Sequence, residues 1–328
     1  MPKSKQLIFS LILTVVSIAV SLAFAEVFLR VKNSSMRSYD IEMWRYAKEL
    51  KVRSLDPALD FEHVKSKAAT LQGVEIRLNE WGLRGGPVAP RTAGERRIQF
   101  LGGSITLGWG VAEADTVTAR LERLFSSADI KAEVLNGGVG NYNAERYVAR
   151  FLKDLTPLDP TDIVVHYFLR DAEELDRGGG NILLRYSELA VTLWIAYHRL
   201  LDRAGEHSLV EHYRRAYQPS AAGALAMQAS LERLADYAKA HGVRLYLAMT
   251  PDVHNLVDYK LTFVHDLMRK IALQHGYVHI DLLPAMLGRP PQDIFAMPGD
   301  PHPNALGHEL MAATIFPVLR GTGEPAKD

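Results

Sequence analysis

The chain has 328 residues, of which 48% are hydrophobic and 23% are charged, a composition typical of a globular protein. Its 38 basic and 38 acidic residues give a formal net charge of zero, so it lacks the basic excess of nucleic-acid-binding proteins, and we expect no nucleic-acid partner. The absence of cysteine excludes disulfides, thiolate catalysis and zinc sites with cysteine ligands.

The N-terminus carries an uncharged run, LIFSLILTVVSIAVSLAFA, from Leu7 to Ala25. A helix of this length spans about 28 Å, close to the thickness of the hydrocarbon core of a bilayer. The end of the run, Ala23-Phe24-Ala25, also has the form of a signal-peptide cleavage site. The length of the run favours an uncleaved membrane anchor over residues 1–30, and a cleaved signal peptide is the alternative. Basic residues flank the run on both sides, so charge does not fix its orientation.

Residues 31–90 are polar and irregular, and we interpret them as a stalk and lead-in segment with one strand near 74–78. Beyond residue 91 short apolar segments alternate with amphipathic ones. The predicted strands are RIQFL (97–101), AEVLN (132–136), DIVVHYF (162–168), VRLYLAM (243–249) and YVHID (277–281). This alternation predicts a domain over 91–322 with a three-layer α/β/α sandwich, whose five-stranded sheet is mostly parallel and flavodoxin-like.

One segment inside this domain departs from the alternation. Residues 181–218 are strongly apolar at first, but Arg185 and Glu188 interrupt the apolar run. Charged side chains at such positions argue against a second membrane span. The segment is predicted to be a helical insertion that packs over the domain or forms a cap near the active site.

The loops after parallel strands meet at one edge of the sheet, and ligands bind there. The polar residues expected at this edge are Ser104, Asn141, Arg170, Asp171, His254, Asp300 and His302. A serine hydroxyl becomes a nucleophile when a histidine takes its proton and a carboxylate orients that histidine. Ser104, His302 and Asp300 supply these three roles. The alternative, that all three are helix-capping and turn residues, stays open.

Metal and cofactor templates do not match the chain. Asp300, His302 and His308 lack a second cluster of ligands, so no metal is expected. The glycine-rich stretches match neither a phosphate-binding loop nor a dinucleotide-binding fingerprint, so no cofactor is expected.

Four blocks of the chain, over about residues 75–320, resemble those of the SGNH (GDSL-type) hydrolases. NEWGLRG followed by IQFLGGSITLGWGV resembles the segment before the first block and that block itself in membrane-anchored members. VLNGGVGNYNAE, HYFLRDAEE and GDPHPNALGH resemble the second, third and last blocks. The resemblance implies a catalytic triad of Ser104, Asp300 and His302, and an oxyanion hole formed by Ser104, Asn141 and the side chain at position 170.

The chain departs from the family pattern at several of these positions. Gly103 stands where the family has aspartate, Asn141 where it has glycine, and Arg170 where it has asparagine. One residue, in place of the commoner two, separates Asp300 from His302. Asn141 carries the family role only through its backbone N–H, since asparagine tolerates left-handed backbone angles.

The role of Arg170 stays open among three alternatives. Its guanidinium stabilises the developing oxyanion, binds an anionic sugar or phosphate, or forms a salt bridge with Asp171, Glu173 or Glu174. The last alternative leaves the oxyanion hole without its side-chain donor.

The resemblance implies a serine esterase or acyltransferase that acts on O-acyl esters, chiefly O-acetyl esters, of a cell-surface or exported carbohydrate. The hydrolase-like domain is then extracytoplasmic, in the periplasm or at the cell surface, and is secreted if the N-terminal segment is cleaved. Asp171 and His254 are candidate substrate-binding residues on the same edge. The alternative is a catalytically weak or inactive SGNH-fold protein that binds carbohydrate or serves as a scaffold.

Overall fold

The computed structural model describes residues 3–35, 38–175, 182–204, 209–297 and 300–321. The chain forms two compact units, one of Met1–Lys48 with Gly178–Glu206, the other of Glu49–Arg177 with His207–Asp328. Residues 49–90, most of the expected stalk, belong to the unit that contains the sheet, and most of the expected helical insertion belongs to the unit that contains the N-terminal helix.

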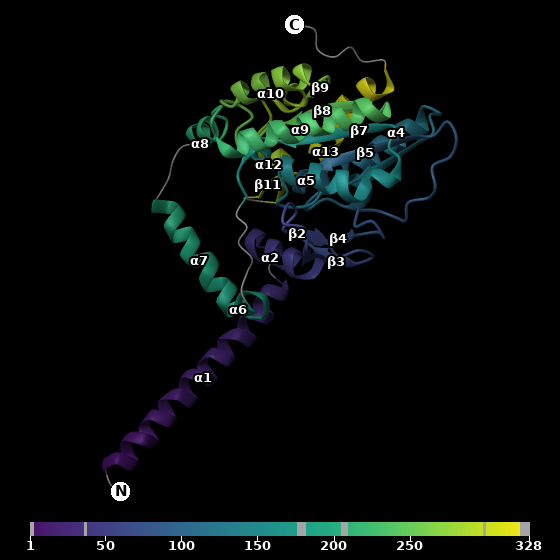
Figure 1. Ribbon diagram of the computed structural model, residues 1–328. Coiled ribbons are helices and arrows are strands. Elements are labelled where there is room, and N and C mark those ends of the chain that lie inside the picture. Colours follow the sequence, from purple (N-terminus) through teal and green to yellow (C-terminus); the bar gives the residue numbers. More distant parts are fainter. Residues whose placement is uncertain (1–2, 36–37, 176–181, 205–208, 298–299, 322–328) are drawn as a thin grey trace. The chain divides into compact units, whose positions relative to one another are not determined.

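The first unit is helical. Its elements are α1 (Lys3–Ser35), most of α2 (Tyr39–Leu50), α6 (Ile182–Tyr186) and α7 (Glu188–Ala204), shown in Figure 1. The predicted apolar run lies wholly inside α1, and its side chains are exposed. Among the described residues, α1 is the one helix long and apolar enough to cross a membrane, a property that a signal sequence shares.

The second unit is built around a parallel sheet. Its strands lie in the order β6-β5-β7-β8-β9, and every neighbouring pair is parallel. Their bounds are β5 (Arg96–Gly102), β6 (Ala132–Asn136), β7 (Asp162–Phe168), β8 (Arg244–Thr250) and β9 (Val278–Asp281). Numbered along the chain, this order is the flavodoxin-like 2-1-3-4-5. The predicted fold class is confirmed.

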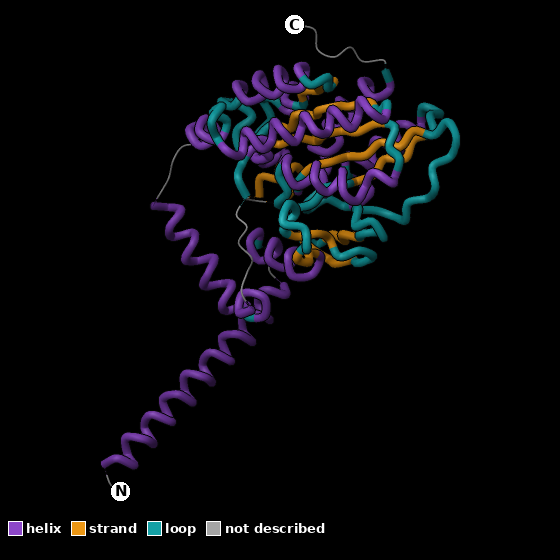
Figure 2. Tube along the Cα trace, in the orientation of Figure 1, coloured by secondary structure: helices purple, strands orange, loops and turns teal. Residues whose placement is uncertain are grey.

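Helices cover both faces of the sheet, as the tube of Figure 2 shows. One core lies under α5 (Ala144–Arg150), α9 (Ala222–His241) and α10 (Thr262–Gln274), and the other lies under α4 (Val117–Ser127) and α13 (Ala305–Arg320). The strands supply both cores because successive side chains point to opposite faces, so that Val165 joins the first core and Val164 the second. These are the three layers of the sandwich.

The remaining elements of this unit are short. Three antiparallel pairs flank the sheet: β1 (Lys51–Arg53) with β2 (Phe61–His63), β3 (Ala68–Leu71) with β4 (Val74–Arg77), and β10 (Phe295–Met297) with β11 (Asp300–Pro303). The short helices are α3 (Ser104–Leu107), η1 (Glu113–Asp115), η2 (Phe151–Leu155), η3 (Thr156–Leu158), η4 (Leu169–Ala172), α8 (Leu209–Ala216), α11 (Leu283–Met286) and α12 (Pro291–Ile294).

The sheet has one point at which its strand order reverses. β5 lies between β6 and β7, so the chain leaves β5 toward one edge of the sheet and later returns to its other side. Loops diverge at such a point, and the carboxyl ends of the flanking strands bound a crevice that ligands use in α/β proteins. The segment that carries Ser104 begins there, directly after β5.

Candidate active site

Ser104 lies where β5 turns into a short helix. The strand ends at Gly102, and α3 begins two residues later with Ser104 itself. Close packing requires glycine at position 102, because a Cβ atom there would lie 2.1 Å from Thr106 Oγ1 and 2.7 Å from the His166 carbonyl oxygen. The turn therefore holds Ser104, half-buried, at the carboxyl edge of the sheet.

A hairpin near the C-terminus brings a histidine to this serine. His302 belongs to β11, which pairs with β10, and the residue is 9% exposed. Its Nε2 atom lies 2.7 Å from Ser104 Oγ, although the two residues are 198 positions apart in the chain. An imidazole that accepts at Nε2 can remove the hydroxyl proton, which makes Ser104 a candidate nucleophile.

The turn after His302 fixes the hairpin in place. Asn304 caps α13, since its Oδ1 accepts from the Gly307 N–H at 3.1 Å. Its Nδ2 donates to the Asp293 carbonyl oxygen at 2.8 Å. The backbone of Asp300, the predicted orienting carboxylate, belongs to β11 two residues before His302. The side chain of Asp300 lies outside the described part of the structure, so its role stays a prediction.

Asn141, the predicted second oxyanion donor, follows β6 in a glycine-rich loop. Its φ of +65° is the left-handed conformation that asparagine tolerates. The loop packs directly against the serine turn, because the Val139 N–H donates to the Gly102 carbonyl oxygen at 3.1 Å. A Cβ atom on Gly138 would lie 2.1 Å from the backbone nitrogen of Leu107 in α3. The loops that carry Asn141 and Ser104 are therefore in contact.

Lys51, in the segment interpreted as a stalk, was not predicted to be near the site. Its Nζ donates to the Gly140 carbonyl oxygen at 2.6 Å and lies 4.0 Å from the centre of the Phe61 ring. Burial lowers the pKa of Lys51 well below its usual value, and the charge of Arg146 acts in the same direction. Lys51 thus binds the peptide group that also contains the Asn141 N–H.

Arg84, the arginine of the block NEWGLRG, was also missed by the sequence reasoning. It is buried, and its Nη1 donates to the carbonyl oxygens of Leu107 at 2.8 Å and Gly108 at 2.7 Å. Its Nη2 donates to the carbonyl oxygens of Val111 at 2.7 Å and Glu75 at 3.0 Å. A cation is favourable beside the last carbonyl groups of a helix. Arg84 therefore holds the end of the helix that begins with Ser104.

Arg170 points to an acidic partner in the structure. Its side chain is 59% exposed, and its Nε lies 3.1 Å from Glu173 Oε2. The other oxygen of Glu173 lies 2.8 Å from His212 Nε2 in α8. Of the three alternatives left open by the sequence, the structure contains the salt bridge.

Asp171, a predicted substrate-binding residue, is buried. Its Oδ2 accepts the Phe168 N–H at 3.0 Å and the Tyr147 hydroxyl at 3.2 Å. Burial raises the pKa of Asp171 to about 8, although these two hydrogen bonds act in the opposite direction. The contacts tie the loop after β7 to α5, which is a structural role.

The raised pKa of Asp171 predicts that stability falls as the pH rises. Between about pH 4 and pH 8 the native carboxyl group holds a proton that the unfolded chain has already lost, so the free energy of unfolding decreases across this range. Asparagine mimics the protonated carboxyl group and does not titrate. The free energy of unfolding of Asp171→Asn should therefore fall less steeply with pH than that of the wild type, by up to about 1.4 kcal/mol per pH unit. Denaturant unfolding of both proteins at pH 5, 6, 7 and 8 measures the difference. Parallel pH curves would contradict the assignment, and the exposed Asp236→Asn serves as the control.

His254, the other predicted substrate-binding residue, is half-exposed in the loop after β8. Its Nδ1 lies 2.7 Å from Asp252 Oδ1, and this hydrogen bond raises the pKa of His254 above its usual value. Its ring lies 6.2 Å from the ring of Phe295, centre to centre. Since Phe295 belongs to the hairpin that carries His302, His254 lies beside that hairpin.

Among the residues that the structure describes, no group of three histidine, cysteine, aspartate or glutamate side chains is arranged to hold a metal ion. His308 is buried, and its Nδ1 accepts the Val117 N–H at 3.0 Å, which holds the start of α4.

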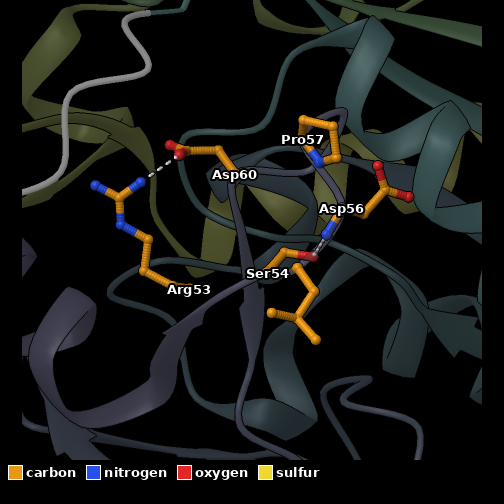
Figure 3. Close-up of a pocket in the computed structure, with 6 residues that line it drawn as sticks. Arg53, Ser54, Asp56, Pro57 and Asp60 are labelled. Carbon is orange, nitrogen blue, oxygen red and sulfur yellow. Dashed lines mark hydrogen bonds and ion pairs between the residues drawn. The ribbon is translucent and has the colours of Figure 1, made fainter.

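Figure 3 shows a shallow hollow lined by the end of β1 and the residues after it, namely Arg53, Ser54, Leu55, Asp56, Pro57 and Asp60. Its charged groups are paired, since Arg53 Nη1 lies 3.0 Å from Asp60 Oδ1 and Asp56 Oδ2 lies 3.5 Å from Lys153 Nζ. Its hydroxyl group is also engaged, because Ser54 Oγ accepts the Asp56 N–H at 3.0 Å. Neither Ser104 nor His302 lines this hollow, so it is not part of the candidate site.

Comparison with known proteins gives similarity only at the level of structure. No family model matches the chain, and no curated protein matches it. Similar solved structures include a two-domain esterase active on acetylated mannans, co-crystallised with mannopentaose (18% identity over 72% of this chain and 52% of that chain, TM-score 0.46). Others are the lipase/acylhydrolase from Enterococcus faecalis (17% identity, 71% and 100% covered, TM-score 0.43) and LAE5, an α/β hydrolase enzyme from the metagenome of Lake Arreo, Spain (18% identity, 72% and 100% covered, TM-score 0.45).

The chain spans about half the length of the first of these proteins. At 17% to 18% identity and TM-scores of 0.43 to 0.46, the similarity assigns neither an activity nor a substrate to this chain.

Proposed function

We propose that the chain is a serine hydrolase or acyltransferase acting on carboxylic esters. The observation that carries this proposal is the 2.7 Å contact between His302 Nε2 and Ser104 Oγ at the carboxyl edge of a parallel sheet. Capping and turn roles alone do not require this contact, whereas proton transfer from a nucleophile to a base does.

Each residue has a defined role in the proposed reaction. His302 removes the proton of Ser104 Oγ as that oxygen attacks the ester carbonyl, and then gives the proton to the departing alcohol. Asp300 orients His302. The backbone N–H groups of Ser104 and Asn141 stabilise the oxyanion of the tetrahedral intermediate. Water resolves the acyl-enzyme in hydrolysis, and an acceptor alcohol resolves it in transfer.

Substrate and location follow from the resemblance of the sequence blocks to membrane-anchored SGNH hydrolases. The proposed substrate is an O-acetyl or related O-acyl ester on a cell-surface or exported carbohydrate. The helix α1 anchors the chain, and the hydrolase-like unit works on the extracytoplasmic side. What supports the anchor is the length, apolar composition and exposure of α1.

A fluorophosphonate probe tests the proposed nucleophile, because such probes react with activated serine hydroxyls. The full chain in lipid nanodiscs should be labelled at Ser104, as identified by mass spectrometry, and should release acetate from aryl acetates. Ser104→Ala should lose both the label and the turnover. Ser126→Ala, at an exposed serine of α4, should keep both. A folded wild-type chain that is not labelled at Ser104 would contradict the proposal.

The salt bridge of Arg170 favours a second function, that of a non-catalytic carbohydrate-binding protein. Glu173 engages the Nε of Arg170, and loss of one donor from an oxyanion hole costs about a hundred- to a thousandfold in turnover. This alternative predicts binding of an acetylated polysaccharide that survives Ser104→Ala, with no ester turnover above background. Turnover that depends on Ser104 would exclude it.

A further inference from the structure

The helices α6 and α7 of the first unit carry large apolar side chains on their outer surface. Seven of these side chains have exposed fractions of 49% to 74%, although they are aliphatic or aromatic. They are Ile182, Leu183, Tyr186, Leu193, Trp194, Tyr197 and Leu200. We call them the apolar face. Single exposed apolar residues are normal on protein surfaces, but a contiguous set marks an interaction site.

The helical period places the apolar residues of α7 on one side. Leu193, Tyr197 and Leu200 are spaced by four and three residues, so they follow one another along the same side of the helix, and Trp194 borders them. These large apolar residues therefore form one stripe along α7, and no described residue of this unit covers it.

The opposite side of α7 faces its own unit. Val191 is buried, and Arg199 forms an ion pair with Asp40 of α2. Glu188 accepts a hydrogen bond from Asn33 Nδ2 at 2.6 Å. By the helical period, the charged residues Glu188 and Arg199 thus lie on the side of α7 away from the apolar stripe.

The start of α7 is fastened to α1 directly beyond the apolar run. The Glu26 carboxylate accepts hydrogen bonds from Ser187 Oγ at 2.8 Å and from the N–H groups of Glu188 at 3.1 Å and Leu189 at 3.0 Å. Arg30 Nη2 donates to the Tyr186 carbonyl oxygen at 2.7 Å. Because the apolar run ends at Ala25, these contacts place the first turn of α7 where a spanning α1 leaves the hydrocarbon core.

The direction of α7 suits a helix that lies on a membrane. From its junction with α1, α7 does not run back alongside α1 but diverges from it (Figure 1). The stripe includes Trp194 and Tyr197, the side-chain types that are enriched where hydrocarbon meets water. Amphipathic helices with these properties bury their apolar side at the boundary between headgroups and acyl chains.

We propose that α6 and α7 form an interfacial element that inserts its apolar face into the surface of the bilayer that α1 crosses. The occupant of the apolar face is lipid, because the fastening to α1 at Glu26 brings the face to the end of the membrane span. The proposal rests on the proposed anchor role of α1, and it is independent of the chemistry at Ser104.

Spin labelling tests the proposal directly, because the chain has no cysteine of its own. Single-cysteine variants Leu193→Cys and Leu200→Cys report on the apolar face, Thr192→Cys on the other side of α7, and Val16→Cys on the middle of the apolar run. Each full-length variant is labelled with a nitroxide in lipid nanodiscs, and its collision rates with oxygen and with a water-soluble nickel chelate are measured by electron paramagnetic resonance. Oxygen partitions into lipid, and the chelate stays in water.

We expect oxygen collisions to exceed chelate collisions several-fold at positions 193, 200 and 16, and the order to reverse at position 192. If position 16 reports lipid while 193 and 200 report water, the interfacial role is wrong and the anchor stands. If the label at position 16 also reports water, both the interfacial role of α7 and the anchor role of α1 are wrong. Spin–spin broadening at 193 and 200 would show that a second copy of the chain covers the apolar face, which also overturns the proposal.

Discussion

Replacing His302 with alanine is expected to lower the turnover of an aryl acetate by about a hundred- to ten-thousandfold, the usual contribution of a positioned general base. His302 Nε2 is 2.7 Å from Ser104 Oγ. In the alanine variant no imidazole contacts the Ser104 hydroxyl to accept its proton. The loss should appear in kcat and kcat/KM together, because the proton is transferred in the transition state. Steady-state kinetics on the full chain measure it.

Chemical rescue separates this role from a structural one. Imidazole added to His302→Ala can occupy the vacated space and accept the proton, so turnover should recover in part as the imidazole concentration rises. The control is His241→Ala, which alters an exposed histidine at the end of α9 and should leave turnover unchanged. A His302→Ala chain within about tenfold of the wild type would show that another group serves as the base.

The strands could be predicted to within about one residue at each end because their pattern is local. DIVVHYF, for example, is a run of β-branched and aromatic residues with turn-forming neighbours, and β7 has the predicted bounds Asp162–Phe168. Five such runs separated by amphipathic helices predict a parallel sheet that is covered by helices on both faces. The strand order then places Ser104 at the reversal point of the sheet.

The charged residues around the site could not be predicted in the same way. Lys51 and Arg84 occur in a polar segment, where a cation is ordinarily solvated, and only the folded chain brings them to Gly140 and α3. Arg170 had three partners available, and a long side chain selects among them by tertiary contact. The fastening of α7 to Glu26 joins residues about 160 positions apart, and no local pattern indicates it.

Lys51→Met is expected to lower kcat by about ten- to a hundredfold with little change in KM, somewhat less than the loss of an oxyanion donor itself. The Gly140 carbonyl and the Asn141 N–H belong to one planar peptide group. A hydrogen bond to the carbonyl oxygen polarises that group and makes its N–H a stronger donor, since chains of hydrogen bonds reinforce one another at low dielectric. Lys51 donates this bond at 2.6 Å.

The contact also fixes the direction in which the Asn141 N–H points. Asn141 has φ +65°, a conformation that non-glycine residues adopt at some cost, so its peptide needs outside contacts to hold it. Lys51 Nζ sits between the Gly140 carbonyl oxygen and the Phe61 ring, which leaves the lysine little freedom to move. Methionine has a similar length and can pack on Phe61, but it cannot donate to the carbonyl oxygen.

The separation of kcat from KM distinguishes this positioning role from general damage to the fold. An oxyanion donor acts mainly on the transition state, so weakening it lowers kcat, whereas a disordered site would also raise KM. Lys65→Met, at an exposed lysine of the same segment, is the matched control and should behave like the wild type. If folded Lys51→Met has an unchanged kcat, the Asn141 N–H does not stabilise the negative charge that develops on the substrate oxygen. The proposed oxyanion hole would then need a different second donor.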